Sequence, residues 1–145
     1  MKAEVSSPGR TLVVTPSRCT ACRTCELACA FYHPVRGLPG LSRITAHRMG
    51  EDDGIPLVCF QCEEAACAAV CPVQAIRRNV ATGALELDPD RCLGCRLCTV
   101  ACPFGQIRFD AKSGLPYKCD LCGGNPACAA FCPTQALVYE EDGGA

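Results

Sequence analysis

Cys92-Leu-Gly-Cys95-Arg-Leu-Cys98-Thr-Val-Ala-Cys102-Pro103 is the stretch that decides the fold. Cys19 to Cys29 has the same cysteine spacing, and two other groups keep the order with a wider middle gap. Together the four groups use all 16 cysteines of the 145 residues. The other three groups are Cys19, Cys22, Cys25 and Cys29; Cys59, Cys62, Cys67 and Cys71; and Cys119, Cys122, Cys128 and Cys132. Such a density of cysteine, divided so evenly, indicates a duplicated unit scaffolded by sulfur.

The repeat extends beyond the cysteines. Three groups continue alike, as Cys-Pro-Val-Gln-Ala-Ile (71–76), Cys-Pro-Phe-Gly-Gln-Ile (102–107) and Cys-Pro-Thr-Gln-Ala-Leu (132–137). Cys29 departs from this pattern because Ala30 follows it in place of proline. The intervals between groups leave room for little more than a hairpin each, so the sequence predicts duplicated modules with short connections.

Composition excludes several classes of protein. The 49% of hydrophobic residues includes the cysteines and no tryptophan, so the hydrocarbon core is small and the sulfurs must help to hold the chain together. The net charge of −1 and the lack of a basic run argue against nucleic-acid binding. Apolar runs such as 65–76 fall short of the roughly 20 residues of a membrane helix. The first ten residues resemble no export signal, so we expect a cytoplasmic, reducing location without membrane insertion.

The cysteine spacing favours iron–sulfur clusters over the other uses of sulfur. Two-residue gaps wrap a tight loop around a [4Fe–4S] cubane, while the fourth cysteine of such a run ligates the neighbouring cluster. Zinc ribbons instead separate two Cys-x-x-Cys pairs by a dozen or more residues. Disulfides lack an oxidising compartment, and cysteines two residues apart pair poorly. Sixteen cysteines would satisfy four cubanes.

Short strands and helices are expected between the cysteine groups. Residues 11–15 are mostly β-branched and predict a strand that 136–139 could pair with. Residues 75–78 with 84–87, and 107–109 with 115–117, predict two hairpins across glycine-containing turns. Each three-residue gap before a fourth cysteine predicts one short helix that carries that cysteine. Residues 30–58 form the one insertion without a repeat partner, and insertions of that size are often functional.

Other candidate residues carry a weaker signal. His33 and His47 in the insertion are expected at the surface or in hydrogen bonds rather than as cluster ligands. Glu63 and Glu64 are expected to form a solvated rim, and the scattered arginines are expected at the surface: Arg43, Arg48, Arg77 and Arg78. Backbone amides near Gly94, Gly123 and Gly124 can approach the sulfurs closely. No catalytic triad, phosphate loop or dinucleotide motif is present, so we expect no catalytic residue.

With these motifs the sequence resembles the iron–sulfur subunit family of dimethyl-sulfoxide reductase. The resemblance covers residues 10–140 and rests on the order of the groups, the two widened gaps, Cys119-Asp-Leu-Cys122 and Cys-Pro-Thr-Gln-Ala-Leu. It implies an α+β fold of two interleaved bacterial-ferredoxin-like modules, an outer one at about 10–58 plus 103–140 and an inner one at about 59–102. Residues 1–9 and 141–145 would be flexible ends. The compact length and Cys25-Glu-Leu-Ala-Cys29-Ala-Phe-Tyr-His33 are most similar to the small subunits of tungsten aldehyde oxidoreductases.

The resemblance also implies four [4Fe–4S] clusters with crossed ligands. Cluster 1 would take Cys19, Cys22, Cys25 and Cys132, and cluster 2 would take Cys119, Cys122, Cys128 and Cys29. Cluster 3 would take Cys59, Cys62, Cys67 and Cys102, and cluster 4 would take Cys92, Cys95, Cys98 and Cys71. We call these four sets quartets 1 to 4.

The implied function is an electron relay without catalysis of its own. It would pass single electrons between a tungsten or molybdenum catalytic subunit, an aldehyde oxidoreductase, and a second partner such as a flavoprotein. A formate dehydrogenase, hydrogenase or carbon monoxide dehydrogenase subunit remains an alternative, as do a free polyferredoxin and an iron–sulfur sensor. Because a row of clusters has two ends, self-association is also open.

Overall fold

The computed structural model describes residues 9–35 and 38–141. Most of the two expected flexible ends, 1–9 and 141–145, lies outside these ranges. Gly9 and Glu141 are described, and Glu141 is the last residue of a strand. The described part of the chain has no helix that is long and apolar enough to cross a membrane.

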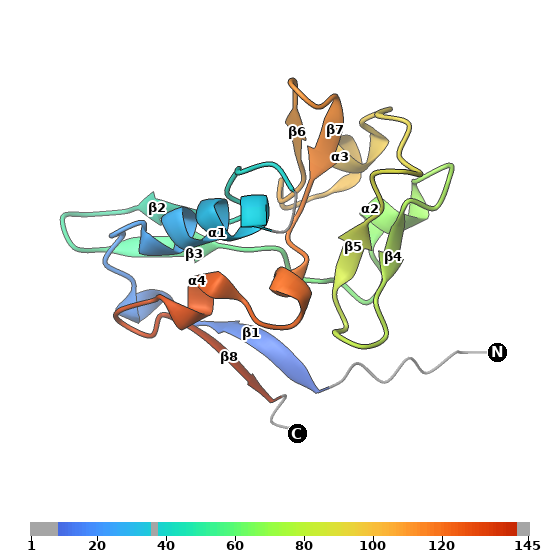
Figure 1. The fold of residues 1–145 in the computed structure, drawn as a ribbon. Helices are drawn as coiled ribbons and strands as arrows, with labels where there is room; N and C mark the ends of the chain where they lie inside the picture. The colour runs from blue at the N-terminus through green and yellow to red at the C-terminus, as the bar shows by residue number, and fades with distance from the viewer. Residues whose placement is uncertain (1–8, 36–37, 142–145) are drawn as a thin grey trace.

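The described residues form short helices and four separate two-stranded antiparallel sheets (Figure 1). This confirms the expected α+β class with short hairpins and short helices. In chain order the elements are β1 (Arg10–Val14), η1 (Pro16–Arg18), α1 (Thr24–Val35), β2 (Thr45–Arg48), β3 (Gly54–Leu57), α2 (Ala66–Ala69), β4 (Ile76–Arg78), β5 (Leu85–Leu87), α3 (Leu97–Ala101), β6 (Arg108–Asp110), β7 (Leu115–Tyr117), η2 (Leu121–Gly123), α4 (Ala127–Ala130) and β8 (Leu137–Glu141).

Three of the four sheets were expected from the sequence. β1 pairs with β8 from Arg10 opposite Glu141 to Val14 opposite Leu137, so the two ends of the described chain lie side by side. β4 pairs with β5, and β6 pairs with β7, across the predicted turns. Figure 1 shows the β1–β8 ladder (blue and red) beneath α1 and α4, with the β6–β7 hairpin at the top of the view and the β4–β5 hairpin at the right.

The fourth sheet was not expected. β2 and β3 form a hairpin inside the 30–58 insertion, and their register puts Ala46 opposite Pro56. A proline and a glycine within a four-residue strand weaken the sequence signal for β structure. The hairpin is held against the first cysteine loop, because the backbone N–H of Gly54 donates to the carbonyl of Cys19 (3.0 Å).

The short length of three helices follows from the sequence. α2, α3 and α4 end before a Cys-Pro pair, because proline disfavours the helical conformation of the residue that precedes it. The fourth cysteine of these groups therefore follows the helix, instead of lying in it as expected. After Cys29 no proline intervenes, and α1 continues to Val35.

The core consists of two clusters rich in sulfur and methyl groups. One joins Cys25, Cys29 and Cys128 with Ile44, Ala46, Val58 and Leu137. The other joins Cys67 and Cys98 with Ala65, Ile76, Leu85 and Ile107. The helices pack in two corresponding pairs: α1 packs against α4, and α2 packs against α3. Cysteine and alanine make up most of the buried apolar residues, so hydrocarbon packing alone contributes little stability.

Candidate metal centres

Each cysteine group opens with the same backbone turn. The second residue after the first cysteine has a positive φ in all four groups, at Ala21 (55°), Gln61 (51°), Gly94 (67°) and Leu121 (54°). Left-handed conformations are unfavourable for residues with a Cβ, so the loops hold local strain. The turn folds the chain back on its own sulfur, since the N–H groups of Gly94 and Leu121 donate to the Sγ atoms of Cys92 and Cys119 (both 3.4 Å).

A second repeated turn follows the Cys-Pro pairs. The third residue after the fourth cysteine has a positive φ at Gln74 (52°), Gly105 (64°) and Gln135 (55°). The next N–H then points at sulfur, as Ala75 donates to Cys71 Sγ (3.2 Å) and Gln106 donates to Cys102 Sγ (3.5 Å). In the first group, which lacks the proline, the N–H of Arg43 from the insertion donates to Cys29 Sγ (3.2 Å). Amide donors aimed at sulfur suit thiolates that carry the negative charge of a cluster.

Two of the predicted quartets line small cavities. Quartet 1 (Cys19, Cys22, Cys25 and Cys132) lines one of about 20 Å³. Quartet 3 (Cys59, Cys62, Cys67 and Cys102) lines another of about 30 Å³. In both cases three cysteines come from one group and the fourth from a distant group. The structure therefore brings together the members of these two predicted sets.

In the other two quartets, the effect of neighbouring sulfurs on the pKa of a buried thiol indicates which cysteines lie close together. Burial raises the pKa of Cys128 far above its ordinary value, and the neighbouring sulfurs of Cys119, Cys29 and Cys122 raise it further. These four residues are quartet 2. In quartet 4, burial raises the pKa of Cys98, and the nearby Cys92 and Cys95 raise it further. Cys71, the remaining member, follows α2, which packs against the α3 helix that carries Cys98.

The buried thiols are neutral unless a metal displaces their protons. All 16 are unbridged. Burial raises the pKa of Cys25 to about 11 and that of Cys119 to about 12. A thiolate at these positions therefore needs a cationic partner, and iron provides one because metal binding displaces the thiol proton.

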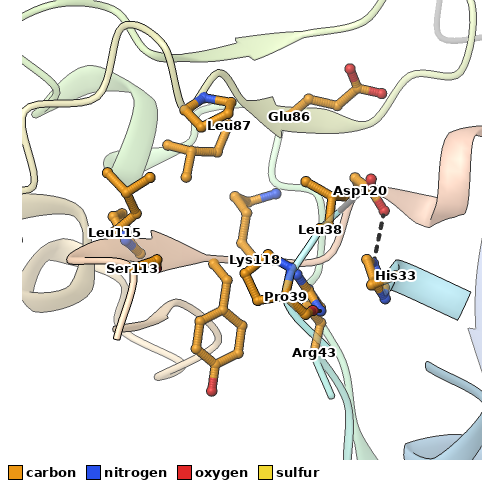
Figure 2. A pocket seen from close by; sticks show the side chains of 13 residues that line it. His33, Leu38, Pro39, Arg43, Glu86, Leu87, Ser113, Leu115, Lys118 and Asp120 are labelled. Carbon is orange, nitrogen blue, oxygen red and sulfur yellow. Dashed lines mark hydrogen bonds and ion pairs between the residues drawn. The ribbon is translucent and has the colours of Figure 1, made fainter. Parts of the chain in front are cut away.

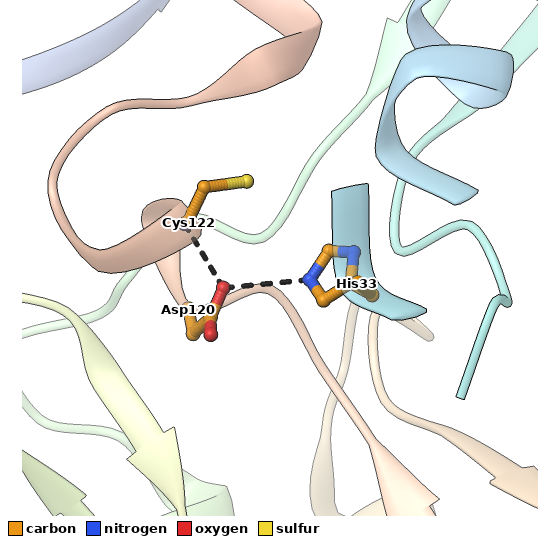
Figure 3. A group of neighbouring side chains, drawn as sticks. All are labelled: His33, Asp120 and Cys122. Atoms are coloured by element: carbon orange, nitrogen blue, oxygen red, sulfur yellow. Dashed lines mark hydrogen bonds and ion pairs between the residues drawn. The ribbon is translucent and has the colours of Figure 1, made fainter. Parts of the chain in front are cut away.

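His33, Asp120 and Cys122 meet at the edge of quartet 2 (Figure 3). His33 is buried, and its Nδ1–H donates to the carbonyl oxygen of Cys29 (2.6 Å) while Nε2 lies 3.6 Å from Asp120 Oδ1. The same carboxylate oxygen accepts from the backbone N–H of Cys122 (2.9 Å). Burial lowers the pKa of His33, but the hydrogen bonds to Asp120 and Cys29 outweigh it and raise the pKa to about 9. Each histidine was expected either at the surface or in hydrogen bonds. His33 is buried and hydrogen-bonded, whereas His47 is exposed.

Two arginines differ from the expected surface positions. Arg43 is 5% exposed, and its guanidinium donates to the carbonyls of Pro39 (2.7 Å) and Leu41. The half-buried Arg78 donates to the carbonyls of Cys62 (2.5 Å) and Gly83 (2.6 Å). The expectation of a surface position is therefore wrong for Arg43, because backbone carbonyls solvate its charge inside the protein. Arg48 and Arg77 are exposed, as are Glu63 and Glu64.

Sequence reasoning missed Lys118 altogether. This side chain is 6% exposed, and its ammonium donates to the carbonyls of Leu85 and Cys119 (2.8 Å to the latter). Its position beside Cys119 in the sequence was the one available signal, and adjacency does not reveal burial.

Comparison with known proteins agrees with this architecture. The family model of a 4Fe–4S dicluster domain matches residues 53–143, and that of a 4Fe–4S binding domain matches residues 16–32. The polyferredoxin-like subunit of an aliphatic sulfonate oxidoreductase of Pyrococcus furiosus is 36% identical over 83% of this chain and 70% of its own length. One of the chains of the anaerobic dimethyl sulfoxide reductase of Escherichia coli is 36% identical over 87% of this protein and 70% of its own length.

Among solved structures, a chain of the active-site complex BamBC of benzoyl coenzyme A reductase is similar. It superposes with a TM-score of 0.51 at 26% identity, covering 91% of this chain and 76% of that one. The expected family and the binding of multiple [4Fe–4S] clusters are thereby confirmed. The chain belongs to the family of ferredoxin-like 4Fe–4S electron-transfer subunits of oxidoreductase complexes, which includes the iron–sulfur subunits of the dimethyl sulfoxide reductases.

Proposed function

We propose that the chain is a non-catalytic relay that holds four [4Fe–4S] clusters in a row, ligated by quartets 1 to 4 as two interleaved modules. In each module, paired helices supply cysteines to two quartets. α1 carries Cys25 for quartet 1 and Cys29 for quartet 2, while α4 carries Cys128 for quartet 2 and is followed by Cys132 for quartet 1. Adjacent clusters within a pair then share two helices, which keeps them close.

The two pairs are joined through quartets 2 and 3. The sulfur of Cys59 is near enough to that of Cys119 to raise its pKa, after the larger effect of burial. The side chain of Gln61 bridges the same junction, since its amide donates to the carbonyl of Cys119 (3.1 Å) and accepts from the N–H of Leu85 (2.8 Å). This single junction, which turns two pairs into one row, is the observation that carries the proposal.

When bound, [4Fe–4S] clusters supply one-electron storage at potentials between about −700 and +450 mV, set by charge, hydrogen bonds to sulfur and exposure. Two of these factors, hydrogen bonds to sulfur and exposure, are set by the chain at the cysteines themselves. Backbone N–H groups donate to the sulfurs of Cys29, Cys71, Cys92, Cys102 and Cys119. Exposure differs among the ligands, because Cys22 and Cys95 reach solvent whereas Cys25, Cys29 and Cys128 are buried.

We assign the catalytic partner to the tungsten or molybdenum oxidoreductases, as an aldehyde oxidoreductase, with a flavoprotein or similar redox protein at the other end of the row. Two observations support this assignment. The segment from Cys25 to His33 resembles the small subunits of tungsten aldehyde oxidoreductases, and the chain is similar to a sulfonate oxidoreductase subunit. Sixteen unbridged thiols suit the reducing cytoplasm. A partner of the formate dehydrogenase or hydrogenase type is the second candidate, favoured by 33% identity to formate hydrogenlyase subunit 2 of Escherichia coli.

Anaerobic purification of the tagged chain from its native host, followed by metal and flavin analysis, tests the proposal. About sixteen irons per chain, with tungsten and flavin in the same peak, is the expected result. Nickel in that peak, with neither tungsten nor molybdenum, would move the assignment to the second candidate. Elution alone with a full iron complement would indicate a free polyferredoxin, and the size of that species would show whether copies self-associate. Stoichiometric zinc with little iron would overturn the cluster assignment.

A further inference from the structure

Lys118 occupies the junction between the two pairs of quartets. It follows β7 and precedes Cys119, which belongs to quartet 2. Its side chain extends toward β5, where its ammonium donates to the carbonyl of Leu85, and it also donates to the carbonyl of Cys119 (2.8 Å). Figure 2 shows Lys118 reaching toward the strand that carries Glu86 and Leu87.

The same side chain borders quartet 3. Lys118 lines the cavity of about 30 Å³ that Cys59, Cys62, Cys67 and Cys102 surround. It also lines the neighbouring cavity of about 520 Å³ drawn in Figure 2, so it forms part of the wall between the two. Burial raises the pKa of Cys67 in quartet 3, and the Lys118 charge opposes that rise. The same opposition acts on Cys119 in quartet 2.

The charge of Lys118 is not neutralised by a neighbouring carboxylate of the described residues. The residue is almost wholly buried, and backbone carbonyl dipoles accept the hydrogen bonds of its ammonium. Within the part of the chain that the structure describes, no carboxylate forms an ion pair with it. A buried charge acts on its neighbours at an effective dielectric constant far below that of water. Lys118 therefore exerts an electrostatic effect on two cluster sites at once.

We propose that Lys118 tunes the reduction potentials of the two central clusters, those of quartets 2 and 3. Its buried charge favours their reduced state and offsets the repulsion between them. The inference rests on the proposed ligand sets. A cubane with four thiolates has a charge of about −2 when oxidised and about −3 when reduced, so a nearby cation stabilises the reduced form more. Because Lys118 contacts the surroundings of both quartets 2 and 3, its charge acts on both sides of the junction between the two pairs.

Redox titration of the purified holoprotein, followed by electron paramagnetic resonance, tests this inference. Lys118→Met removes the charge and keeps the length, Lys118→Gln removes the charge and keeps a donor, and Lys118→Arg keeps the charge. Lys112→Gln, in the exposed β6–β7 turn, is the matched control for loss of one positive charge. Iron content is measured on every variant.

The two neutral variants are expected to lower the equilibrium constant for one-electron reduction of two clusters by about tenfold or more, which is 59 mV for a one-electron couple. In the neutral variants, the reduction constants of the other two clusters are expected to stay within a factor of three of the wild-type values. In Lys118→Arg and Lys112→Gln, the same is expected of all four clusters. Unchanged potentials in fully loaded neutral variants would overturn the inference. Loss of iron from both neutral variants would also overturn it, in favour of a role in folding. Failure of the wild type to bind about sixteen irons would instead refute the ligand sets.

Discussion

At the scale of single residues, two of the left-handed positions in the repeated turns are occupied by glycine. Gly94 has a φ of +67°, and a Cβ added there would lie 2.6 Å from the carbonyl oxygen of Gly114. Gly105 has a similar φ of +64°, but no atom lies within 4 Å of a Cβ at that position. The two sites thus carry the same backbone penalty and differ only in the steric contact.

This pair of glycines gives a controlled prediction. Gly105→Ala is expected to lower the free energy of unfolding by about 1–2 kcal/mol, the cost of a left-handed residue with a Cβ. Gly94→Ala is expected to cost more and to release iron, because the backbone of the β6–β7 turn cannot yield as a flexible side chain would. Thermal unfolding under anaerobic conditions, with iron analysis, measures both. Equal losses in the two variants would contradict the steric explanation.

Residue identity predicted the cysteine groups well and the buried cations poorly. Spacing alone separated the four groups, because the tight loops around a cluster require particular gaps. The burial of Arg43 and Lys118 depends instead on where the carbonyls of Leu41 and Leu85 lie in the folded chain. A charged side chain is favourable inside a protein only where such acceptors converge, and convergence is a tertiary property.

At the scale of elements, β8 connects β1 to the first core cluster. Leu137 is 2% exposed and packs with Cys25, Cys29 and Cys128. β8 also contacts α4. The strand therefore supports the helices on which quartets 1 and 2 depend.

Leu137→Ala is expected to lower the free energy of unfolding by about 3 kcal/mol, since it removes a large buried side chain and leaves a cavity. Iron should be lost first from quartets 1 and 2, with the spectroscopic signals of the other pair retained. Val80→Ala, at a position that is 73% exposed, is the control and should change neither quantity. Simultaneous loss of all clusters would argue against separate modules. Anaerobic denaturation followed by visible absorbance measures the order of loss.

The elements also show where local sequence was sufficient. The β4–β5 and β6–β7 hairpins follow from short apolar runs around glycine turns, and the Cys-Pro pairs set the ends of three helices. The β2–β3 hairpin was missed because Gly54 and Pro56 obscure it. Gly54 is required there by a neighbour, since a Cβ would lie 2.7 Å from the Cβ of Ala21. That contact between an insertion and a cysteine loop cannot be deduced from either segment alone.

At the scale of the whole molecule, the small hydrocarbon core makes folding dependent on iron. Cysteine and alanine dominate the buried apolar residues. Removal of iron leaves the buried thiols without the centre that joins distant groups, so the binding free energy of the metal is also folding free energy.

Chelation of iron is therefore expected to abolish cooperative unfolding and most of the far-ultraviolet circular dichroism signal. Treatment with a thiol reductant alone is the control and should leave both unchanged, because the sulfurs are unbridged. An iron-free chain that kept a cooperative transition would show that the apolar clusters suffice. Circular dichroism and calorimetry before and after chelation make the comparison.

The pairing of β1 with β8 has a consequence for how the protein is made in the cell. A ribosome releases Arg10 early and its partner Glu141 only after all the elements between them, whereas the strands of the β4–β5 hairpin emerge almost together. During translation the middle of the chain can fold while the first strand still waits, which reverses the usual order in which N-terminal segments fold first. The earliest cysteines to be synthesised thus stay exposed longest. A dedicated chaperone or rapid delivery of clusters would protect them until β8 emerges.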